Sequence, residues 1–200
     1  MKRHLRRIAL VAFVVICFYG WGIVTDSQVL HDQLLRLHVV GASNSKEDQD
    51  VKLLVRDAVL ESLKEGLQDV TDPQKAYDYV ARMLPKVEAA ANRCLKAAGF
   101  TDTAAVYLTE EAFPTREYDT FSLPAGVYKA LRVVIGEGEG RNWWCVVFPQ
   151  LCMQNNFVET ANMAGLEPEL CETLEGDYEI RFWLLEKWGE LKNHFFDASE

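Results

Sequence analysis

Polar side chains that could do chemistry gather between residues 38 and 56. Spacings of four residues place Asp48, Lys52 and Arg56 on one face of a predicted helix, with Gln49 beside them. His38 lies in the stretch just before this helix, and a histidine near a carboxylate can act as a general base. A solvated helix face with one ion pair between residues four apart explains the same spacing. The pattern leaves both interpretations open.

A second cluster is the aromatic run Asn142-Trp143-Trp144-Cys145. Successive side chains of a β-strand point to opposite faces, so Trp143 and Trp144 cannot share one face. We expect one tryptophan in the core. The other is expected either under a helix or exposed as an anchor for a partner protein, a role in which tryptophan is favoured.

The sequence predicts no metal site, no cofactor and no catalytic residues. His31, His38 and His194 lie far apart and lack the spacing of metal ligands. No Gly-x-Ser-x-Gly nucleophile motif occurs. The glycines of residues 136–140 alternate with glutamates, which would repel a phosphate, so we expect a hairpin turn there.

The cysteines permit disulfides if the protein is exported. Cys145 and Cys152 flank a short predicted strand and turn, and a bridge between them would close a small loop. The alternative is that Cys145, Cys152 and Cys171 are small buried hydrophobic residues, as we expect for Cys94 on the apolar face of a helix.

Hydrophobic periodicity predicts the elements that position these side chains. Alternation predicts a half-buried strand over residues 34–40. A serine cap followed by helical spacing predicts a helix over 45–68. An Asp-Pro start predicts a second helix over 72–99, kinked or split at Pro85.

The second half of the chain has the pattern of a sheet. Strands are expected over residues 105–108, 127–135, 143–148 and 178–182, followed by an amphipathic helix over 184–195. We predict an α+β fold in which a strand, two helices, an antiparallel β-meander and the C-terminal amphipathic helix pack as one domain over residues 34–200.

The N-terminus predicts export across a membrane. Basic residues precede an uncharged, largely apolar stretch from Ile8 to Val24, which is the layout of a signal peptide or signal-anchor over residues 1–24. Residues 25–33 form a spacer. No small-residue cleavage motif follows the stretch, so cleavage and retention as an N-terminal anchor both stay open.

The net charge of −9 excludes nucleic-acid binding.

Several motifs of the chain are shared with a known family. They are Arg36-Leu37-His38-Val39, Glu47-Asp48-Gln49, Leu123-Pro124-Ala125-Gly126 and the run Asn142-Trp143-Trp144-Cys145. The chain resembles stage II sporulation protein R of endospore-forming bacteria over nearly all of the part after the apolar segment. The turn Gly41-Ala42-Ser43-Asn44 departs from the family's pattern, which argues against chemistry at that turn.

The resemblance implies a signalling protein and not an enzyme. Members of this family are made in the forespore and secreted into the space between forespore and mother cell. There they activate a membrane-embedded aspartic protease that processes the sigma-E precursor, and this protease is the expected partner. We predict partner contacts through polar and aromatic residues that core periodicity does not explain: His38, Asp48, Gln49, Arg56, Arg132, Asn142, Trp143 and Trp144.

Two other classes of function remain. The first is an extracytoplasmic hydrolase of cell wall or peptide, assembled around His38 and a carboxylate. A buried His38 with satisfied ring nitrogens and no cleft beside it would argue against that hypothesis. The second is a membrane-anchored structural module.

Overall fold

A computed structural model of the chain describes residues 31–118 and 121–149. Along these residues the elements are β1 (Leu35–Val40), α2 (Lys46–Leu67), α3 (Pro73–Ala97), β2 (Ala104–Phe113), β3 (Arg116–Glu117), β4 (Ser122–Leu123), β5 (Gly126–Ile135) and β6 (Asn142–Phe148). The predicted signal segment, the strand over 178–182 and the C-terminal helix lie outside the described residues.

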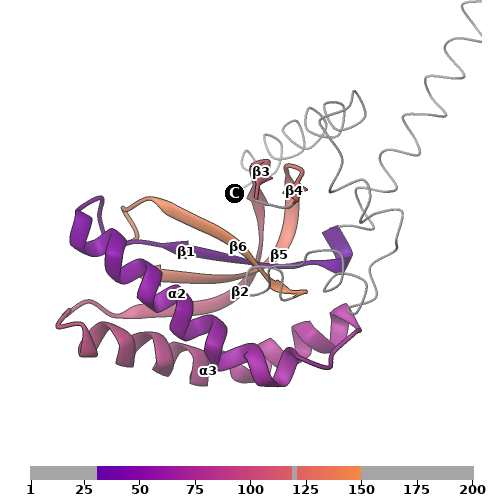
Figure 1. The fold of residues 1–200 in the computed structure, drawn as a ribbon, viewed down its shortest axis with the longest axis horizontal. Helices are drawn as coiled ribbons and strands as arrows, with labels where there is room; N and C mark the ends of the chain where they lie inside the picture. The colour runs from indigo at the N-terminus through magenta and orange to yellow at the C-terminus, as the bar shows by residue number, and fades with distance from the viewer. Residues whose placement is uncertain (1–30, 119–120, 150–200) are drawn as a thin grey trace, which may run out of the picture.

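The fold is α+β, as the sequence predicts. The main sheet has the strand order β2-β5-β1-β6, and both α2 and α3 cover the same face of it (Figure 1). The core lies between these helices and the sheet, and it includes Leu37 and Val39 of β1 and Leu131 and Val133 of β5. We call the opposite face, turned away from α2 and α3, the far face.

The predicted β-meander is wrong in its strand order. β1 lies between β5 and β6, paired parallel to β5 and antiparallel to β6. The glycine-rich turn at 136–140 is therefore not a hairpin turn, because it joins two strands that are separated by a third. It crosses the end of β1, a span of about 10 Å at the usual spacing between strands.

The glycines of this turn serve two purposes. Gly136 and Gly138 have φ values of +57° and +69°, in the left-handed region that favours glycine. Gly140 lies so close to the preceding loop that its N–H donates to Gly41 O at 2.8 Å. A side chain at Gly140 would meet the backbone oxygens of Gly41 and Ser43. The turn thus packs against the loop between β1 and α2.

The prediction that β1 is half-buried is also wrong, because all six of its residues are buried. Leu35, Leu37 and Val39 face the helices as predicted. The residues between them, which alternation assigns to a polar face, include Arg36 and His38, exposed by 0% and 7%. β1 is a central strand, and large side chains cover it on the far face as well.

The helix boundaries follow the predicted caps. Ser45 Oγ accepts from Asp48 N at 3.1 Å, and Asp72 Oδ1 accepts from Lys75 N at 2.9 Å. α3 continues through Pro85 as one helix. Of the two predicted alternatives, a kink or a split, the split is therefore wrong, and the kink stays a prediction. After α3, Gly99 adopts a φ of +84°, as expected for a glycine that ends a helix.

β2 is longer than predicted because it pairs with β5 over its whole length, and α3 covers the start of its outer edge. Ala104 N donates to Asn92 Oδ1 at 2.8 Å, and Val106 N donates to Glu88 Oε2 at 3.2 Å. On its other side the whole strand pairs with β5, from Ala104 to Phe113. These side chains of α3 satisfy edge groups that a free strand would leave open.

The described cysteines differ in state. Cys94 is free and only partly buried, so its predicted burial is only partly right. Cys145 is buried on the helix-facing side of β6 and is disulfide-bonded. Its bonding partner lies outside the described residues, so the pairing with Cys152 stays a prediction.

Candidate functional site

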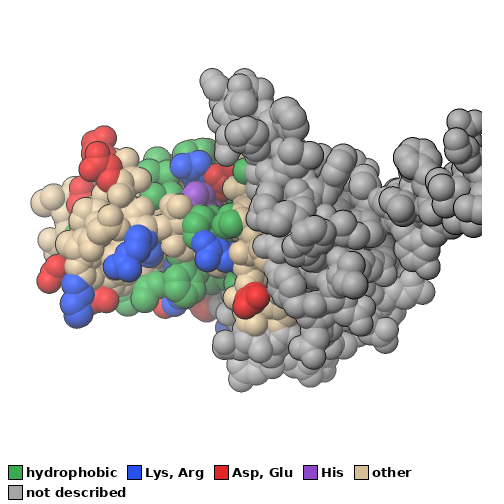
Figure 2. All heavy atoms as spheres, turned by 90° about the horizontal axis from the view of Figure 1, so that it is seen from above, with side chains coloured by type: hydrophobic (Ala, Val, Ile, Leu, Met, Phe, Trp, Pro, Cys, Tyr) green, Lys and Arg blue, Asp and Glu red, His purple; other side chains and the backbone are tan. Residues whose placement is uncertain are grey.

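Charged and aromatic side chains gather on the far face. We call them the far-face cluster, and they are Arg36, His38, Glu111, Arg116, Arg132 and Trp144. Figure 2 looks onto this side of the molecule and shows a histidine beside basic and acidic side chains, with hydrophobic side chains around them. The cluster draws on β1, β2, β3, β5 and β6, so only the folded sheet assembles it.

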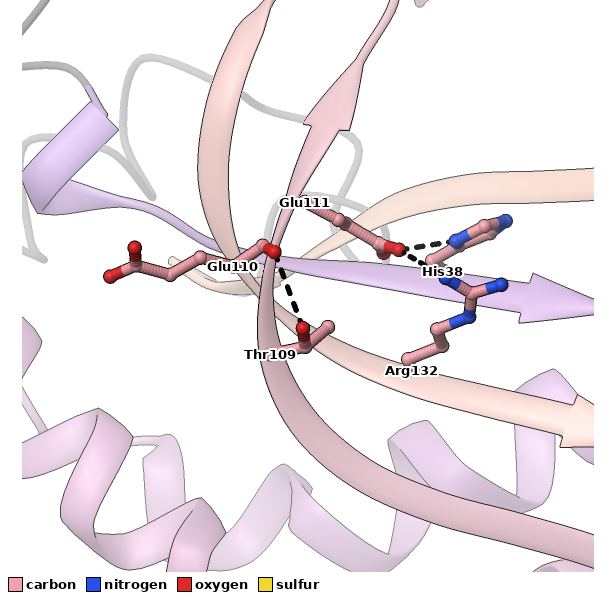
Figure 3. A network of polar contacts seen from close by, with 5 residues as sticks. All are labelled: His38, Thr109, Glu110, Glu111 and Arg132. Carbon is pink, nitrogen blue, oxygen red and sulfur yellow. Dashed lines mark hydrogen bonds and ion pairs between the residues drawn. The ribbon is translucent and has the colours of Figure 1, made fainter. Parts of the chain in front are cut away.

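Glu111 is the centre of the polar part of this cluster. Its Oε1 accepts from Nδ1 of His38 at 2.9 Å, and its Oε2 accepts from Arg132 at 2.9 Å (Figure 3). The register explains the geometry, since His38 lies opposite Arg132 in the parallel pair of β1 and β5. One carboxylate on β2 thereby holds two side chains from the neighbouring strands.

The alternation of side chains along β2 separates the two neighbouring glutamates. Glu111 lies on the far face with 14% of its side chain exposed. The side chain of Glu110 points away from His38 and Arg132 (Figure 3). The backbone carbonyl oxygen of Glu110 accepts a hydrogen bond from Thr109 Oγ1 at 3.2 Å. The two residues form a matched pair for substitution.

Trp144 is the aromatic centre of the cluster. It lies opposite His38 in the pairing of β1 with β6, and the two rings stack at 5.5 Å with an interplanar angle of 16°. The guanidinium of Arg116 lies over the indole ring, 3.9 Å from its centroid. A cation at this distance from a tryptophan face is attracted by the ring's electron density.

Arg36 is the fully buried cation of the cluster, and sequence reasoning missed it. Its Nη2 donates to Tyr118 Oη at 2.9 Å, and that hydroxyl in turn donates to the carbonyl of Trp144 at 3.4 Å. The guanidinium also lies 4.2 Å from the Phe113 ring and 4.9 Å from the Tyr128 ring. The position of Arg36 between apolar residues of a predicted strand could have indicated a buried cation.

Several buried nitrogens of the far face have no hydrogen-bond partner within the part of the chain that the structure describes. They are Arg36 Nε and Nη1, Arg116 Nε, Arg132 Nε and His38 Nε2. The arginine nitrogens can only donate, and His38 Nε2 becomes a donor when the ring is protonated. Buried donors without acceptors cost free energy, and most native proteins leave few of them.

Two of the other predicted contacts, Asp48 and Gln49, lie on the side of the helices. Asp48, Gln49 and Lys52 belong to what we call the loop clasp, which also contains Ser43, Asn44 and Arg141. Ser43 Oγ donates to the Asp48 carboxylate, and Gln49 Nε2 donates to Ser43 O at 2.7 Å. Asn44 Oδ1 accepts from Arg141 N at 3.0 Å. These bonds tie the β1–α2 loop to the β5–β6 turn.

Lys52 completes the loop clasp from α2. Its Nζ donates to Gln49 Oε1 at 2.6 Å and to Arg141 O at 2.8 Å, and the residue is 4% exposed. Burial lowers its pKa, and the nearby Arg141 charge lowers it further. The expected ion pair between Asp48 and Lys52 is not formed. The side chains of Asp48 and Gln49 thus bond to other residues of the loop clasp.

Arg56 and Trp143 form a smaller pair beside α2. Trp143 faces the helix side of β6, 37% exposed, and the Arg56 guanidinium lies 4.6 Å from its ring centroid. Arg56 also pairs with Asp57 at 2.7 Å. Asn142 is exposed at the start of β6, opposite Val40. The two tryptophans do point to opposite faces, and neither is fully buried.

The predicted contact residues therefore do not form one site. The far face brings together His38, Arg132 and Trp144, whereas Asp48, Gln49, Arg56 and Trp143 lie on the side of the helices. Among residues 31–118 and 121–149 there is no group of three or more potential metal ligands. No helix within the same ranges is long and apolar enough to cross a membrane.

The described residues define an α+β fold whose far face carries basic and aromatic side chains. The chain belongs to the stage II sporulation protein R family, whose model matches residues 31–158. The stage II sporulation protein R of Bacillus subtilis (strain 168) is 36% identical over 124 residues, which cover 62% of this chain and 55% of that relative. The match thus spans about half of the relative's length. No solved structure matches the chain.

Proposed function

We propose that this protein is a secreted sporulation signal that activates a membrane-embedded aspartic protease, which then processes the sigma-E precursor in the mother cell. The observation that carries the proposal is the family match over residues 31–158. It supports a role in sporulation, and the role in protease activation comes from what the family resemblance implies. The protein itself is proposed to act by binding and not by catalysis.

The proposed route to the target begins with export from the forespore. Residues 1–24 would act as the signal peptide or anchor, 25–33 as the spacer, and 34–200 as the extracytoplasmic domain. The basic flank and apolar stretch of the N-terminus support this arrangement. The domain would then lie in the space between the forespore and mother-cell membranes.

Activation requires that the protein bind the active state of the protease more tightly than the inactive state. We assign the main contact to the far face, through His38, Arg132 and Trp144. Two observations support this choice. The far face combines cations with an aromatic anchor, the residue types favoured in binding hot spots, and its buried arginine nitrogens lack acceptors. Asp48 and Gln49 would contribute by holding the loops.

Co-expression in a non-sporulating host tests the proposal. The host would carry the protease, the sigma-E precursor and this protein, and processing of the precursor would be followed by immunoblot. We expect processing only when this protein is exported. Equal processing in its absence would refute the proposed function.

Substitutions of the two neighbouring glutamates, Glu110 and Glu111, test whether the far face is the contact surface. Glu111→Gln removes the carboxylate that holds His38 and Arg132 in place. We expect the loss of this positioning to outweigh the gain in positive charge, so that processing falls by about tenfold, as when 1.4 kcal/mol of binding energy is lost. Glu110→Gln makes the same chemical change on the other face of β2 and should leave processing unchanged.

Arg56→Ala tests the pair that Arg56 forms with Trp143. Normal processing by this variant would remove the pair from the proposed contact surface.

One observation favours a hydrolase as the second candidate. The hydrogen bond from His38 Nδ1 to Glu111 would orient the ring as it does for a general base. Against this, His38 is 7% exposed, which restricts access to a substrate. Incubation of the purified protein with peptidoglycan or a casein substrate tests the candidate. Turnover that is lost in His38→Gln would support it, and absence of turnover would reject it.

A further inference from the structure

We propose that the far-face cluster is a binding site for a carboxylate group carried by an acidic peptide segment of a partner protein. That the peptide belongs to the protease rests on the proposed function. Binding of the carboxylate itself does not, and it is testable without the protease.

The first argument is the charge balance of the far-face cluster. It contains three arginines, Arg36, Arg116 and Arg132, and one carboxylate, Glu111, whose two oxygens are already used by His38 and Arg132. The chain as a whole has a net charge of −9. Among residues 31–118 and 121–149, this acidic protein therefore has more positive than negative charge in the far-face cluster.

The second argument is the state of Arg36. The residue is completely buried, yet its side-chain partners among the described residues are neutral, namely the hydroxyls of Tyr118, 2.9 Å from its Nη2, and of Tyr128. Within the same residues its Nε and Nη1 have no hydrogen-bond partner. A buried charge normally has an ionic or fully hydrogen-bonded partner because it is otherwise strongly disfavoured. An anion bound at the cluster would compensate this charge.

The third argument is that two arginines and His38 converge on one aromatic residue. Arg116 lies over the indole of Trp144, His38 stacks on it, and Arg36 reaches its carbonyl through Tyr118. Arg116 is only partly buried, so a ligand can reach it from the surface. We place the carboxylate at Arg116 and Trp144, with the buried Arg36 adding to the positive potential.

A carboxylate fits this cluster better than a phosphate or a nucleic acid. Glu111 is held within the cluster and would repel a dianion more strongly than a monoanion. The acidic surface of the chain repels a polyanionic backbone. The planar guanidinium of arginine matches the geometry of a carboxylate and can donate two parallel hydrogen bonds to it.

The experiment is isothermal titration calorimetry on the full-length protein at low salt. The probes are a short blocked oligoglutamate peptide, the matching oligoglutamine peptide and inorganic phosphate. We expect oligoglutamate to bind at least about tenfold more tightly than either other probe, a difference of the size that one charge-assisted contact supplies. Comparable affinity for oligoglutamine, or tighter binding of phosphate, would overturn the proposal.

Matched variants test where the peptide binds. Arg116→Gln should weaken oligoglutamate binding by about tenfold or more. Lys129→Gln removes the same charge from β5, where the lysine lies over Tyr77 of α3 at 5.4 Å, and should leave the affinity within about twofold. Equal losses in the two variants would mean a general charge effect and refute the site.

Arg132→Gln guards against a folding defect in Arg116→Gln. It removes a partly exposed cation of the same cluster and should also weaken oligoglutamate binding, with an unchanged far-UV circular dichroism spectrum. Unchanged affinity in both arginine variants would refute the site. If oligoglutamate binds as expected but the protein fails to trigger processing, the proposed function fails while the site stands.

Discussion

Lys52 and Arg36, the buried lysine and arginine of the described residues, have opposite surroundings. Lys52 on α2 is 4% exposed, and its ammonium donates to Gln49 Oε1 and Arg141 O. Arg36 on β1 is 0% exposed, and two of its three nitrogens have no acceptor among the residues that the structure describes. Hydrogen-bond acceptors hold the ammonium of Lys52 in place, whereas the guanidinium of Arg36 lies beside aromatic rings.

This difference separates structure from function among the polar residues. A buried polar group with satisfied hydrogen bonds stabilises one arrangement of the chain, and its removal leaves its partners unsatisfied. A buried charge without a counterion destabilises the isolated protein and favours binding of an anion. We therefore assign the loop clasp to folding and the far-face cluster to recognition.

The largest effect on stability is expected from Lys52→Met. Methionine keeps the length of the side chain but leaves Gln49 Oε1 and Arg141 O without their charged donor. We expect the free energy of unfolding to fall by about 2–3 kcal/mol, the range for buried hydrogen bonds to a charged group. Urea denaturation followed by circular dichroism measures the change. A loss below about 0.5 kcal/mol would show that the loop clasp does not stabilise the fold.

Gly140→Ala tests the same clasp through its backbone. The added Cβ would lie 2.7 Å from Gly41 O and closer still to Ser43 O, so the turn and the loop must separate. We expect a loss of about 2 kcal/mol, within the range for steric overpacking. Glu139→Ala is the control, because its exposed side chain should contribute less than about 0.5 kcal/mol. Equal stability of the two variants would contradict the close approach.

Tyr128→Phe tests the far face by pH. The buried Tyr128 Oη donates to Pro124 O at 2.7 Å, and its loss should cost about 1 kcal/mol at neutral pH. Burial raises the pKa of Tyr128 above its ordinary value of 10.0, although the neighbouring Arg36 acts in the opposite direction. The folded protein therefore keeps the phenol proton above pH 10, where the unfolded chain loses it.

The sign of the pH effect follows from this proton. Above pH 10 the folded state binds more protons than the unfolded state, so wild-type stability falls by up to about 1.4 kcal/mol per pH unit from this group. The Tyr128→Phe variant has no phenol at this position, so its stability does not fall for this reason above pH 10. The stability gap between the two proteins should therefore close between pH 9 and pH 11, as measured by urea denaturation at each pH. A constant gap would contradict the raised pKa.

The local elements were predictable from the sequence because their signals are local. Ser45 and the Asp72-Pro73 pair fix the starts of α2 and α3 through bonds within the first helical turn. The opposite orientation of Trp143 and Trp144 follows from strand geometry alone. These predictions needed no knowledge of which strands pair.

The strand order and the site were not predictable in the same way. The pairing of β1 with β5 joins residues separated by most of the described chain, and no local pattern encodes it. The burial of Arg36 depends on that central position. The contact of Glu111 with His38 and Arg132 also depends on it, because the three residues come from three different strands. The residue types indicated which side chains were candidates for partner contacts. Only the folded sheet shows that these candidates lie on two different sides.

The smallest change in stability is expected from Arg36→Met, and it decides the comparison between the two cations. The substitution loses the hydrogen bond to Tyr118 and the contacts with two aromatic rings, each of about 1 kcal/mol. It also removes the penalty of a buried charge without a counterion, which offsets these losses. We expect the free energy of unfolding to stay within about 1 kcal/mol of the wild type, while binding of oligoglutamate and processing of the sigma-E precursor both fall. If Arg36→Met destabilises the protein as much as Lys52→Met does, Arg36 is a structural residue like Lys52, and the far face loses its strongest claim to be a recognition surface.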